Sequence, residues 1–583
     1  IKYQTLMIEC FYEIPQLPVN MALDEAPTLA ETKSAIKEMA SEKSAGSDDI
    51  PAEVYKHGGE SLQERLHNLF KLIWEHKNVP QQLKDALIVH IYKRKGDITC
   101  CDNHRGISLL VIAGKILARI MLNRLQKHVD NADIIPESQC GFRPRRGTND
   151  MIFSVRQLQE KCREQNLDLY MVFIDLTKAF DTVNREGLWR ILKHIGCPET
   201  FVTIIRLLHE GMAAKVMDGG ETSPEFTVTN GTKQGCVLAP TLFSIFFSMM
   251  LLVAFKNEET GITIRSRDDK GLFKAKNFNV LIKTAKKCTF TCLRDLLFAD
   301  DCALVALTQA DLQHLTECFA NAARRFGLTI SLKKTEVMLQ QKPKAAIRIE
   351  PEININGTML KAVPKFTYLG STISANAQLD DEINARIAKA SASFGSLLKR
   401  LWLNHDIRLN TKVSVYHAAV LTPLLYGSEA WTVYRRHIKI LDRFHQKCLR
   451  RMARIRWQQM IPDTQVLKRC KIKGMDALLT KSRLRWSGHL SRMSGDRIPK
   501  RLMYGRIDGL GHVNRGRPCL RYKDTLKKSL INLSIPTADW EHKASNRSAW
   551  RKICSTGIDD YESRRIGRAE EIREARLALL PHR

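Results

Sequence analysis

The sequence predicts a fold of several domains that mixes helices and strands over its first 375 residues and is mainly helical after them. Two observations predict strands: Leu169–Ile174 is an unbroken apolar run, and short apolar runs flank Asp300 and Asp301. A third predicts a helix, because apolar residues recur three and four positions apart from Ile383 to Leu401. The chain has 583 residues, 44% of them hydrophobic, which is enough for more than one core.

The first predicted elements lie before residue 180. Ala86–Asp97 is rich in β-forming residues and ends in a basic turn, so it predicts a strand. Apolar residues at helical spacing from Ile116 to Leu125 then predict a helix. The strand Leu169–Ile174 delivers Asp175 at its end. An apolar strand that ends in a carboxylate often marks a functional site.

The elements that follow surround a pair of acids. The apolar runs on either side of Asp300 and Asp301 predict a tight hairpin with both carboxylates at its tip. A helical stripe from Leu312 to Phe326 comes next, and Gly327 is expected to cap its end. Residues 366–374, FTYLGSTIS, predict another short hairpin.

The charge of the chain favours a polyanionic partner. Lys and Arg number 92 against 62 Asp and Glu, which gives a net charge of +30. Each phosphate that a basic side chain neutralises releases counterions, so such a surface is expected to bind nucleic acid. The alternative is a soluble basic protein without such a partner. The final residues, 470–583, carry 26 Lys or Arg against 12 Asp or Glu, which favours a basic C-terminal domain.

The 15 cysteines are scattered and follow neither a disulfide framework nor a zinc module, so structural thiols in a reducing compartment are expected. The nearest ligand pairs, Cys288 with Cys292 and His445 with Cys448, each lack a second half. No secretory leader or long apolar segment occurs in the sequence, which disfavours secretion and membrane spanning. Residue 1 is Ile, which is compatible with a fragment of a longer translation product.

Asp175 and the pair Asp300–Asp301 suggest metal chemistry. Nucleotide addition needs an activated hydroxyl and a stabilised leaving pyrophosphate, and two Mg²⁺ ions can serve both oxygens. Hard cations prefer carboxylate oxygens. The three acids could hold such ions if their strands are neighbours in one sheet. Taken alone, an exposed Asp-Asp pair is more often a turn.

Four motifs resemble those of the reverse transcriptase family, and the resemblance spans roughly residues 43–374. They are FIDLTKAFD (Phe173–Asp181), NGTKQGCVLAPTLFSIFF (Asn230–Phe247), FADD (Phe298–Asp301) and GLTISLKKTE (Gly327–Glu336). The resemblance implies an α+β right-hand polymerase with fingers, a palm with an antiparallel sheet, a helical thumb and a basic, mainly helical C-terminal region. The expected segments are an N-terminal extension (1–80), fingers and palm (81–375), thumb (376–469) and C-terminal domain (470–583).

The same resemblance assigns the acids and a possible sugar gate. Asp175, Asp300 and Asp301 would ligate two Mg²⁺ ions, with Mn²⁺ as a substitute. Asp181 is expected to cap the following helix instead. Phe180 would lie under the sugar of the incoming nucleotide and exclude a 2′-hydroxyl. The alternative for Phe180 is an ordinary core position.

Further residues are matched to substrate contacts. Gln234 and Gly235 would pack against the incoming nucleotide and the template base, where small residues allow close approach. Lys334 would protonate the leaving pyrophosphate, with Lys333 as the neighbouring choice and a solvated Lys as the alternative. Arg105 would bind the triphosphate, supported by Lys93 or Lys95.

Several segments resemble the LINE-type branch, which lacks long terminal repeats: KSAGSDDIPAE (Lys43–Glu53), NHRGISLL, ESQCGFRPRRGT (Glu137–Thr148) and LLFADDCALVA. The resemblance implies an RNA-directed DNA polymerase with an RNA template, a DNA primer or target, and deoxynucleoside triphosphates. Copying would be primed by a nicked target DNA end, with the endonuclease supplied by sequence outside this chain. A ribonucleoprotein in nucleus and cytoplasm, with no membrane association, is expected. The oligomeric state stays open.

Two other functions remain as alternatives. One is a catalytically silent, domesticated RNA-binding protein that retains the fold, against which the intact Asp175, Asp300 and Asp301 weigh. The other is an RNA-dependent RNA polymerase, which normally shows Gly-Asp-Asp and lacks the ring at Phe180. In the C-terminal region, Arg483, Arg485 and Trp486 could grip RNA by charge and stacking, or Trp486 could belong to the core.

Overall fold

A five-stranded sheet occupies the middle of the chain, with its strands in the order β14-β11-β3-β10-β9. The computed structural model describes residues 12–578 except 95, 234, 267–270, 274–287, 344, 346, 348 and 509–519. β11, β3, β10 and β9 are antiparallel to their neighbours, and β14 adds to β11 in parallel. The strands are β3 (Leu169–Ile174), β9 (Asp295–Phe298), β10 (Asp301–Ala306), β11 (Glu336–Gln340) and β14 (Lys361–Ala362). The predicted strand and acid-tipped hairpin are confirmed, as is the mixture of helices and sheets.

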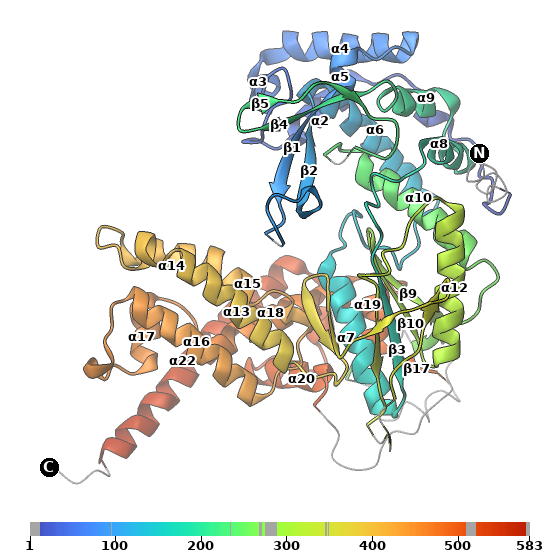
Figure 1. Cartoon of the computed structure of the whole chain (residues 1–583). Helices are drawn as coiled ribbons and strands as arrows, with labels where there is room; N and C mark the ends of the chain where they lie inside the picture. Colours follow the sequence, from blue (N-terminus) through green and yellow to red (C-terminus); the bar gives the residue numbers. More distant parts are fainter. Residues whose placement is uncertain are drawn as a thin grey trace.

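Both faces of this sheet are covered, which explains the unbroken apolar sequence of β3. Met171 and Phe173 pack in one hydrophobic cluster with Met151 and Val155 of helix α7 (Thr148–Gln165). The alternate residues of β3, including Val172, pack in another cluster with Leu312, Leu315 and Phe319 of α12 (Gln309–Arg325). Figure 1 shows α7 and α12 beside the sheet strands. The predicted end of α12 is confirmed, since Gly327 follows the C-cap residue with a φ of +76°.

The N-terminal part forms a second sheet in the order β2-β1-β4-β5, with β6 also paired to β4. Its strands are β1 (Ala86–Tyr92), β2 (His104–Leu109), β4 (Ala213–Asp218), β5 (Glu221–Thr222) and β6 (Phe226–Thr227). Figure 1 shows helices α2 to α6 and α8 to α9 around this sheet, at the top of the view. The helices are α2 (Leu29–Glu38), α3 (Ala52–His57), α4 (Gly59–His76), α5 (Gln81–Lys84), α6 (Ile112–Asn131), α8 (Arg185–His194), α9 (Glu199–Leu207) and α10 (Ala239–Ala254).

Smaller strand pairs complete the mixed part of the chain. The predicted hairpin at residues 366–374 is confirmed as β15 (Lys365–Tyr368) and β16 (Ser371–Ser374). The Phe366 ring stacks on Phe173 of β3 with centroids 4.2 Å apart, so this hairpin covers the central sheet. The other small strands are β7 (Ile262–Ser266), β8 (Thr289–Leu293), β12 (Asn354–Ile355), β13 (Thr358–Met359) and β17 (Arg506–Ile507).

The chain is mainly helical after β16, as predicted. The predicted stripe from Ile383 to Leu401 is α13, which continues into a π-helical turn over Leu398–Trp402. The helices are α13 (Asp380–Ser396), α14 (Leu409–Tyr416), α15 (Thr422–Leu424), α16 (Arg435–Met452), α17 (Asp463–Cys470), α18 (Met475–Arg492), α19 (Ile498–Tyr504), α20 (Tyr522–Asn532), α21 (Trp540–Ser545) and α22 (Arg547–Ala578). Among the described residues, no helix has the length and apolar character that crossing a bilayer requires.

The last helices share a core with α7. Ile152 and Phe153 of α7 lie in a hydrophobic cluster with Leu484 and Trp486 of α18. Arg497, which is 5% exposed, also forms ion pairs of 2.6 Å with Glu137 and Asp150. Apolar and ionic contacts therefore fix the C-terminal helices to the segment that precedes β3.

Candidate active site

The three candidate acids lie at one edge of the central sheet. Asp175 directly follows β3, and Asp301 is the first residue of β10. The antiparallel register pairs Ile174 with Cys302, so the next residues outward, Asp175 and Asp301, lie at the same ends of neighbouring strands. Asp300 lies in the two-residue turn that joins Phe298 to Asp301. Residues more than 120 positions apart in sequence therefore come together here.

The carboxylates affect one another electrostatically. Burial raises the pKa of Asp300, the negative charge of Asp175 adds to the rise, and the positive charge of Arg105 opposes it. Burial and the charges of Asp300 and Asp175 raise the pKa of Asp301 to about 6. The three carboxylates repel one another, and bound cations would reduce this repulsion. The donors at this site are carboxylate oxygens, which suit Mg²⁺ or Mn²⁺ rather than a soft metal.

Lys334 contacts this group directly. Its Nζ lies 3.1 Å from Oδ2 of Asp175, and its side chain is 70% exposed. Two hydrogen bonds position the main chain there: the Ser331 amide donates to the Asp175 carbonyl, and the Asp175 amide donates to Oγ1 of Thr335. The neighbouring Lys333 is exposed. Of the two candidate lysines, Lys334 is therefore the one beside an acid.

The turn that carries Asp300 is held by Gln139, which sequence reasoning did not assign. Ala299 has a φ of +59°, a conformation that costs energy for a residue other than Gly. The side-chain amide of Gln139 donates to the Ala299 carbonyl at 3.1 Å, and its oxygen accepts from the Ala299 and Gly141 amides at 2.8 Å each. Gln139 is fully buried. It therefore braces the residue that precedes Asp300.

In the reaction that the family resemblance implies, nucleotide addition, replacing Gln139 by Leu is expected to lower kcat about 100-fold, because a shift of roughly 1 Å in a reacting group can cost that much. The buried amide and carbonyl of Ala299 would also lose partners, which costs about 1–3 kcal/mol of unfolding free energy for each. Primer extension and denaturant unfolding measure the two effects. The control is Gln340→Leu: Gln340 is equally buried but pairs with Leu169, at the opposite end of β3. Equal kcat losses in the two variants would contradict a positioning role.

Phe180 lies five residues beyond Asp175, with a half-buried ring. The ring stacks on Phe243 of α10 at a centroid distance of 4.5 Å and meets Phe142 edge-on at 6.1 Å. Phe142 itself is 46% exposed. One side of the Phe180 ring is thus supported by the core, and the residue remains partly accessible.

The turn before α10 approaches two other segments closely. Gly235 has a φ of +121°, and a Cβ there would lie 2.4 Å from the Ser108 carbonyl oxygen of β2. Gly231 has a φ of +78°, and a Cβ would lie 2.6 Å from the main chain of Asp181. Gly235 therefore approaches β2 closely, and its packing against the nucleotide and the template base stays a prediction. Gln234 lies outside the described residues.

Two buried cations anchor this turn, and sequence reasoning missed both. Arg185 donates to the carbonyls of His209, Val228, Asn230 and Gly231. Lys233 donates to the carbonyls of Lys84 and Leu208 at 2.6 and 2.5 Å, and burial lowers its pKa to about 8. Only a folded chain reveals such partners, because the carbonyls come from distant segments.

The predicted phosphate ligands lie on the β1–β2 hairpin. Arg105 is exposed on β2, and its charge reaches Asp300. Lys93 lies at the end of β1, where its Nζ donates to the Asp102 carbonyl at 2.8 Å and so ties the hairpin loop. Lys95 lies outside the described residues.

The prediction of a helix cap at Asp181 is wrong. Asp181 does not cap the next helix: α8 begins at Arg185, and Asn184 is the N-cap, since its side chain accepts from the Gly187 amide. In the C-terminal region the structure favours the core alternative over RNA contact, since Arg483 and Trp486 are 4% and 6% exposed, whereas Arg485 is exposed. Arg483 bonds Ser529, and Trp486 meets Phe153 of α7 edge-on, so both belong to the C-terminal core.

Comparison with known proteins gives one family match. Residues 91–373 match the family model described as "Reverse transcriptase (RNA-dependent DNA polymerase)". This range contains all three acids, the Phe180 ring and the Gly235 turn.

Individual relatives extend the similarity to most of the chain. The "RNA-directed DNA polymerase from mobile element jockey" of Drosophila melanogaster is 25% identical over 464 residues, and that of Drosophila funebris is 27% identical over 457 residues. Each alignment covers 77% of this chain and 46% of the relative. The "Putative 115 kDa protein in type-1 retrotransposable element R1DM" of Drosophila melanogaster is 23% identical over 71% of this chain. The chain spans less than half the length of these relatives.

Proposed function

We propose that this chain is an RNA-directed DNA polymerase of a LINE-type element, because residues 91–373 match the reverse transcriptase family model and the similar proteins are named from a mobile element and a type-1 retrotransposable element. The observation that carries the proposal is the meeting of Asp175, Asp300 and Asp301 at one sheet edge. A silent RNA-binding protein would have no need of three acids in mutual repulsion. Their retention favours a working site.

We assign the parts of a right-hand polymerase to the chain as follows. The central sheet with α7 and α12 is the palm, and the β1–β2 hairpin belongs to the fingers. The helix α13 begins the thumb. The segments are an N-terminal extension (1–80), fingers and palm (81–375), thumb (376–469) and a basic C-terminal domain (470–583).

Each residue of the site has a proposed task. Asp175, Asp300 and Asp301 would hold two Mg²⁺ ions, which when bound would activate the primer hydroxyl and stabilise the leaving pyrophosphate. Lys334, beside Asp175, donates a proton to the pyrophosphate oxygen that leaves. Arg105 binds the triphosphate, and Lys93 keeps the hairpin that carries Arg105 in shape.

The substrates follow from the same assignment. The Phe180 ring packs under the sugar and selects deoxynucleotides, while Gln234 and Gly235 lie beside the nucleotide and the template base. The template is RNA and the primer a DNA end, in keeping with the net charge of +30. The element's own RNA, copied from a nicked target in a ribonucleoprotein of nucleus and cytoplasm, is the proposed context.

Metal removal tests this function. The protein is expected to extend a DNA primer on an RNA template with Mg²⁺, and a chelator should abolish extension. Renewed Mg²⁺ or Mn²⁺ should restore it, because carboxylate oxygens accept either ion. The measurement is the length of a labelled primer on a gel, with a DNA-template lane and a ribonucleotide-only lane as controls. Absence of any metal-dependent extension would refute the polymerase function, and preferential ribonucleotide use would favour an RNA polymerase.

A further inference from the structure

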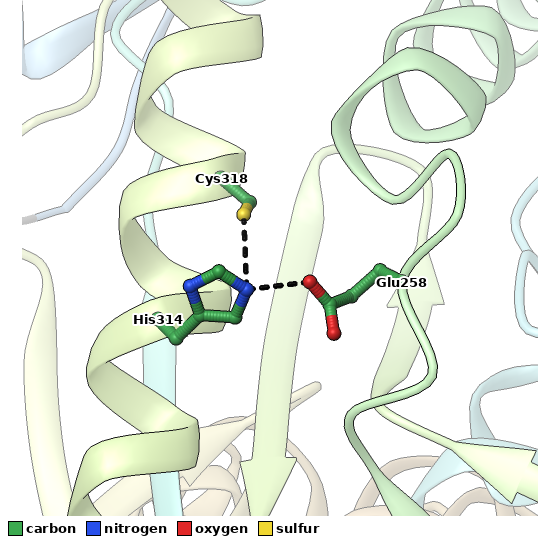
Figure 2. A group of neighbouring side chains, drawn as sticks. All are labelled: Glu258, His314 and Cys318. Atoms are coloured by element: carbon green, nitrogen blue, oxygen red, sulfur yellow. Dashed lines mark hydrogen bonds and ion pairs between the residues drawn. The ribbon is translucent and has the colours of Figure 1, made fainter.

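A second group of potential metal ligands lies on α12 and contains none of the three candidate acids. His314 and Cys318 are four residues apart, which places both on one face of the helix. Glu258 reaches them from the segment between α10 and β7. Figure 2 shows the three side chains pointing toward one another, with the His314 ring between the thiol and the carboxylate.

The distances suit one small cation. Nε2 of His314 lies 2.5 Å from a Glu258 carboxylate oxygen and 3.8 Å from Sγ of Cys318. The ligand atoms of all three residues lie within 4.8 Å of one another. Around a tetrahedral zinc, with metal–sulfur and metal–nitrogen bonds of about 2.3 and 2.0 Å, sulfur and nitrogen lie about 3.5 Å apart. Insertion would require the nitrogen–oxygen contact to open by less than about 1 Å, and the carboxylate oxygen and the sulfur, which lie within 4.8 Å of each other, to close around the ion.

The surroundings hold the carboxylate in place. The second oxygen of Glu258 accepts from the Thr260 amide at 2.9 Å, and the Glu258 carbonyl accepts from Arg294 at 2.5 Å. Ligating carboxylates in metal sites usually have such supporting hydrogen bonds. On α12, the opposite face buries Leu312, Leu315 and Phe319, so the helix that carries His314 and Cys318 is fixed to the core. The ligands are thus presented from two rigid segments.

The geometry points to a zinc site formed by Glu258, His314 and Cys318. Nitrogen, sulfur and oxygen donors together suit Zn²⁺ and are poor ligands for Mg²⁺, which prefers oxygen alone. A thiolate and a carboxylate would balance the two positive charges of the ion. Bound zinc would join the α10–β7 segment to α12 behind the central sheet. The other interpretation is an ion pair between His314 and Glu258 with a thiol beside it.

Zinc binding by the whole 583-residue chain tests the site without any activity measurement. After chelator treatment and desalting, the protein is titrated with Zn²⁺ in excess Mg²⁺, and bound zinc is counted per chain. We expect one tightly held zinc, and binding at least about 100-fold weaker in His314→Ala and Cys318→Ser. The His314 side chain is 51% exposed, so its replacement leaves the core intact. With Co²⁺ instead, the tetrahedral and thiolate absorption bands should appear and be lost in Cys318→Ser.

Two controls separate this site from its surroundings. Cys292 contacts the carbonyls of Glu259 and Thr260 but stands outside the ligand group, so Cys292→Ser should keep the zinc. Asp300→Asn, which removes a candidate catalytic acid, should keep it as well. The proposal is overturned if the wild-type protein holds no tight zinc, or if His314→Ala and Cys318→Ser bind it as Cys292→Ser does. Either result would leave the polymerase proposal untouched.

Discussion

Asp300→Asn is expected to abolish primer extension, with a loss in kcat of at least about 10³-fold, equivalent to roughly 4 kcal/mol of transition-state stabilisation. Asn keeps the shape of the side chain but removes one anionic ligand from the sheet edge. Because Asp300 raises the pKa of Asp301, the variant should also titrate Asp301 at lower pH. Single-nucleotide extension rates and NMR titration of the carboxyl groups measure the two effects.

Asp300→Asn should lose activity without losing unfolding free energy. Removing one of three mutually repelling carboxylates is expected to leave the metal-free protein as stable as the wild type, or more stable. The matched control is Asp168→Asn, just before the other end of β3, where Asp168 accepts from the Lys342 amide. Asn can still accept that bond, so extension should stay close to normal. Equal extension by Asp300→Asn and the wild type would exclude catalysis at this sheet edge.

Phe180→Val is expected to raise the use of ribonucleotides relative to deoxynucleotides by about 100-fold, because the smaller side chain leaves room for a 2′-hydroxyl. Incorporation of each nucleotide by the same primer and template gives the ratio of kcat/KM values. The variant also loses the stacking of Phe180 on Phe243, so a modest loss of stability should accompany it.

The neighbouring ring provides the comparison for this change. Phe142 meets Phe180 edge-on and is itself partly exposed, and its φ of +57° disfavours a β-branched residue, so Phe142→Leu removes the neighbouring ring without that strain. That variant should keep the wild-type preference for deoxynucleotides. If Phe180→Val also keeps it, Phe180 is a core residue and not a sugar gate.

The sheet edge was predictable because its signals are local. The apolar run of β3 and the short runs around Asp300 each predict a strand with an acid at its end. Gln139 could not be found in this way, since its value lies in bonds to Ala299, 160 residues away. The segment around Gln139 resembles the family, but its sequence does not reveal that the Gln139 side chain bonds to the turn before Asp300.

Residue type and spacing in the sequence also led to one wrong prediction and missed one group of side chains. Asp181 has the right residue type for a helix cap, but Asn184 lies three positions nearer to the start of α8 and takes that place. The spacing of His314 and Cys318 is visible in the sequence, whereas Glu258 lies 56 residues earlier. Trp486 and its basic neighbours suggested an RNA contact because sequence does not reveal which side of α18 faces α7.

Helix α7 packs on the central sheet and also on the C-terminal helices, and this limits where the chain can be truncated. One set of α7 side chains, including Met151, supports the sheet, and another set, including Phe153, packs against Trp486 and Tyr522 of helices that begin after residue 470. A truncated chain lacking Arg497 would leave Asp150 buried beside an uncovered apolar surface. The C-terminal helices therefore cannot be removed or exchanged alone. In chimeras between related elements, α7 and these helices should be exchanged together.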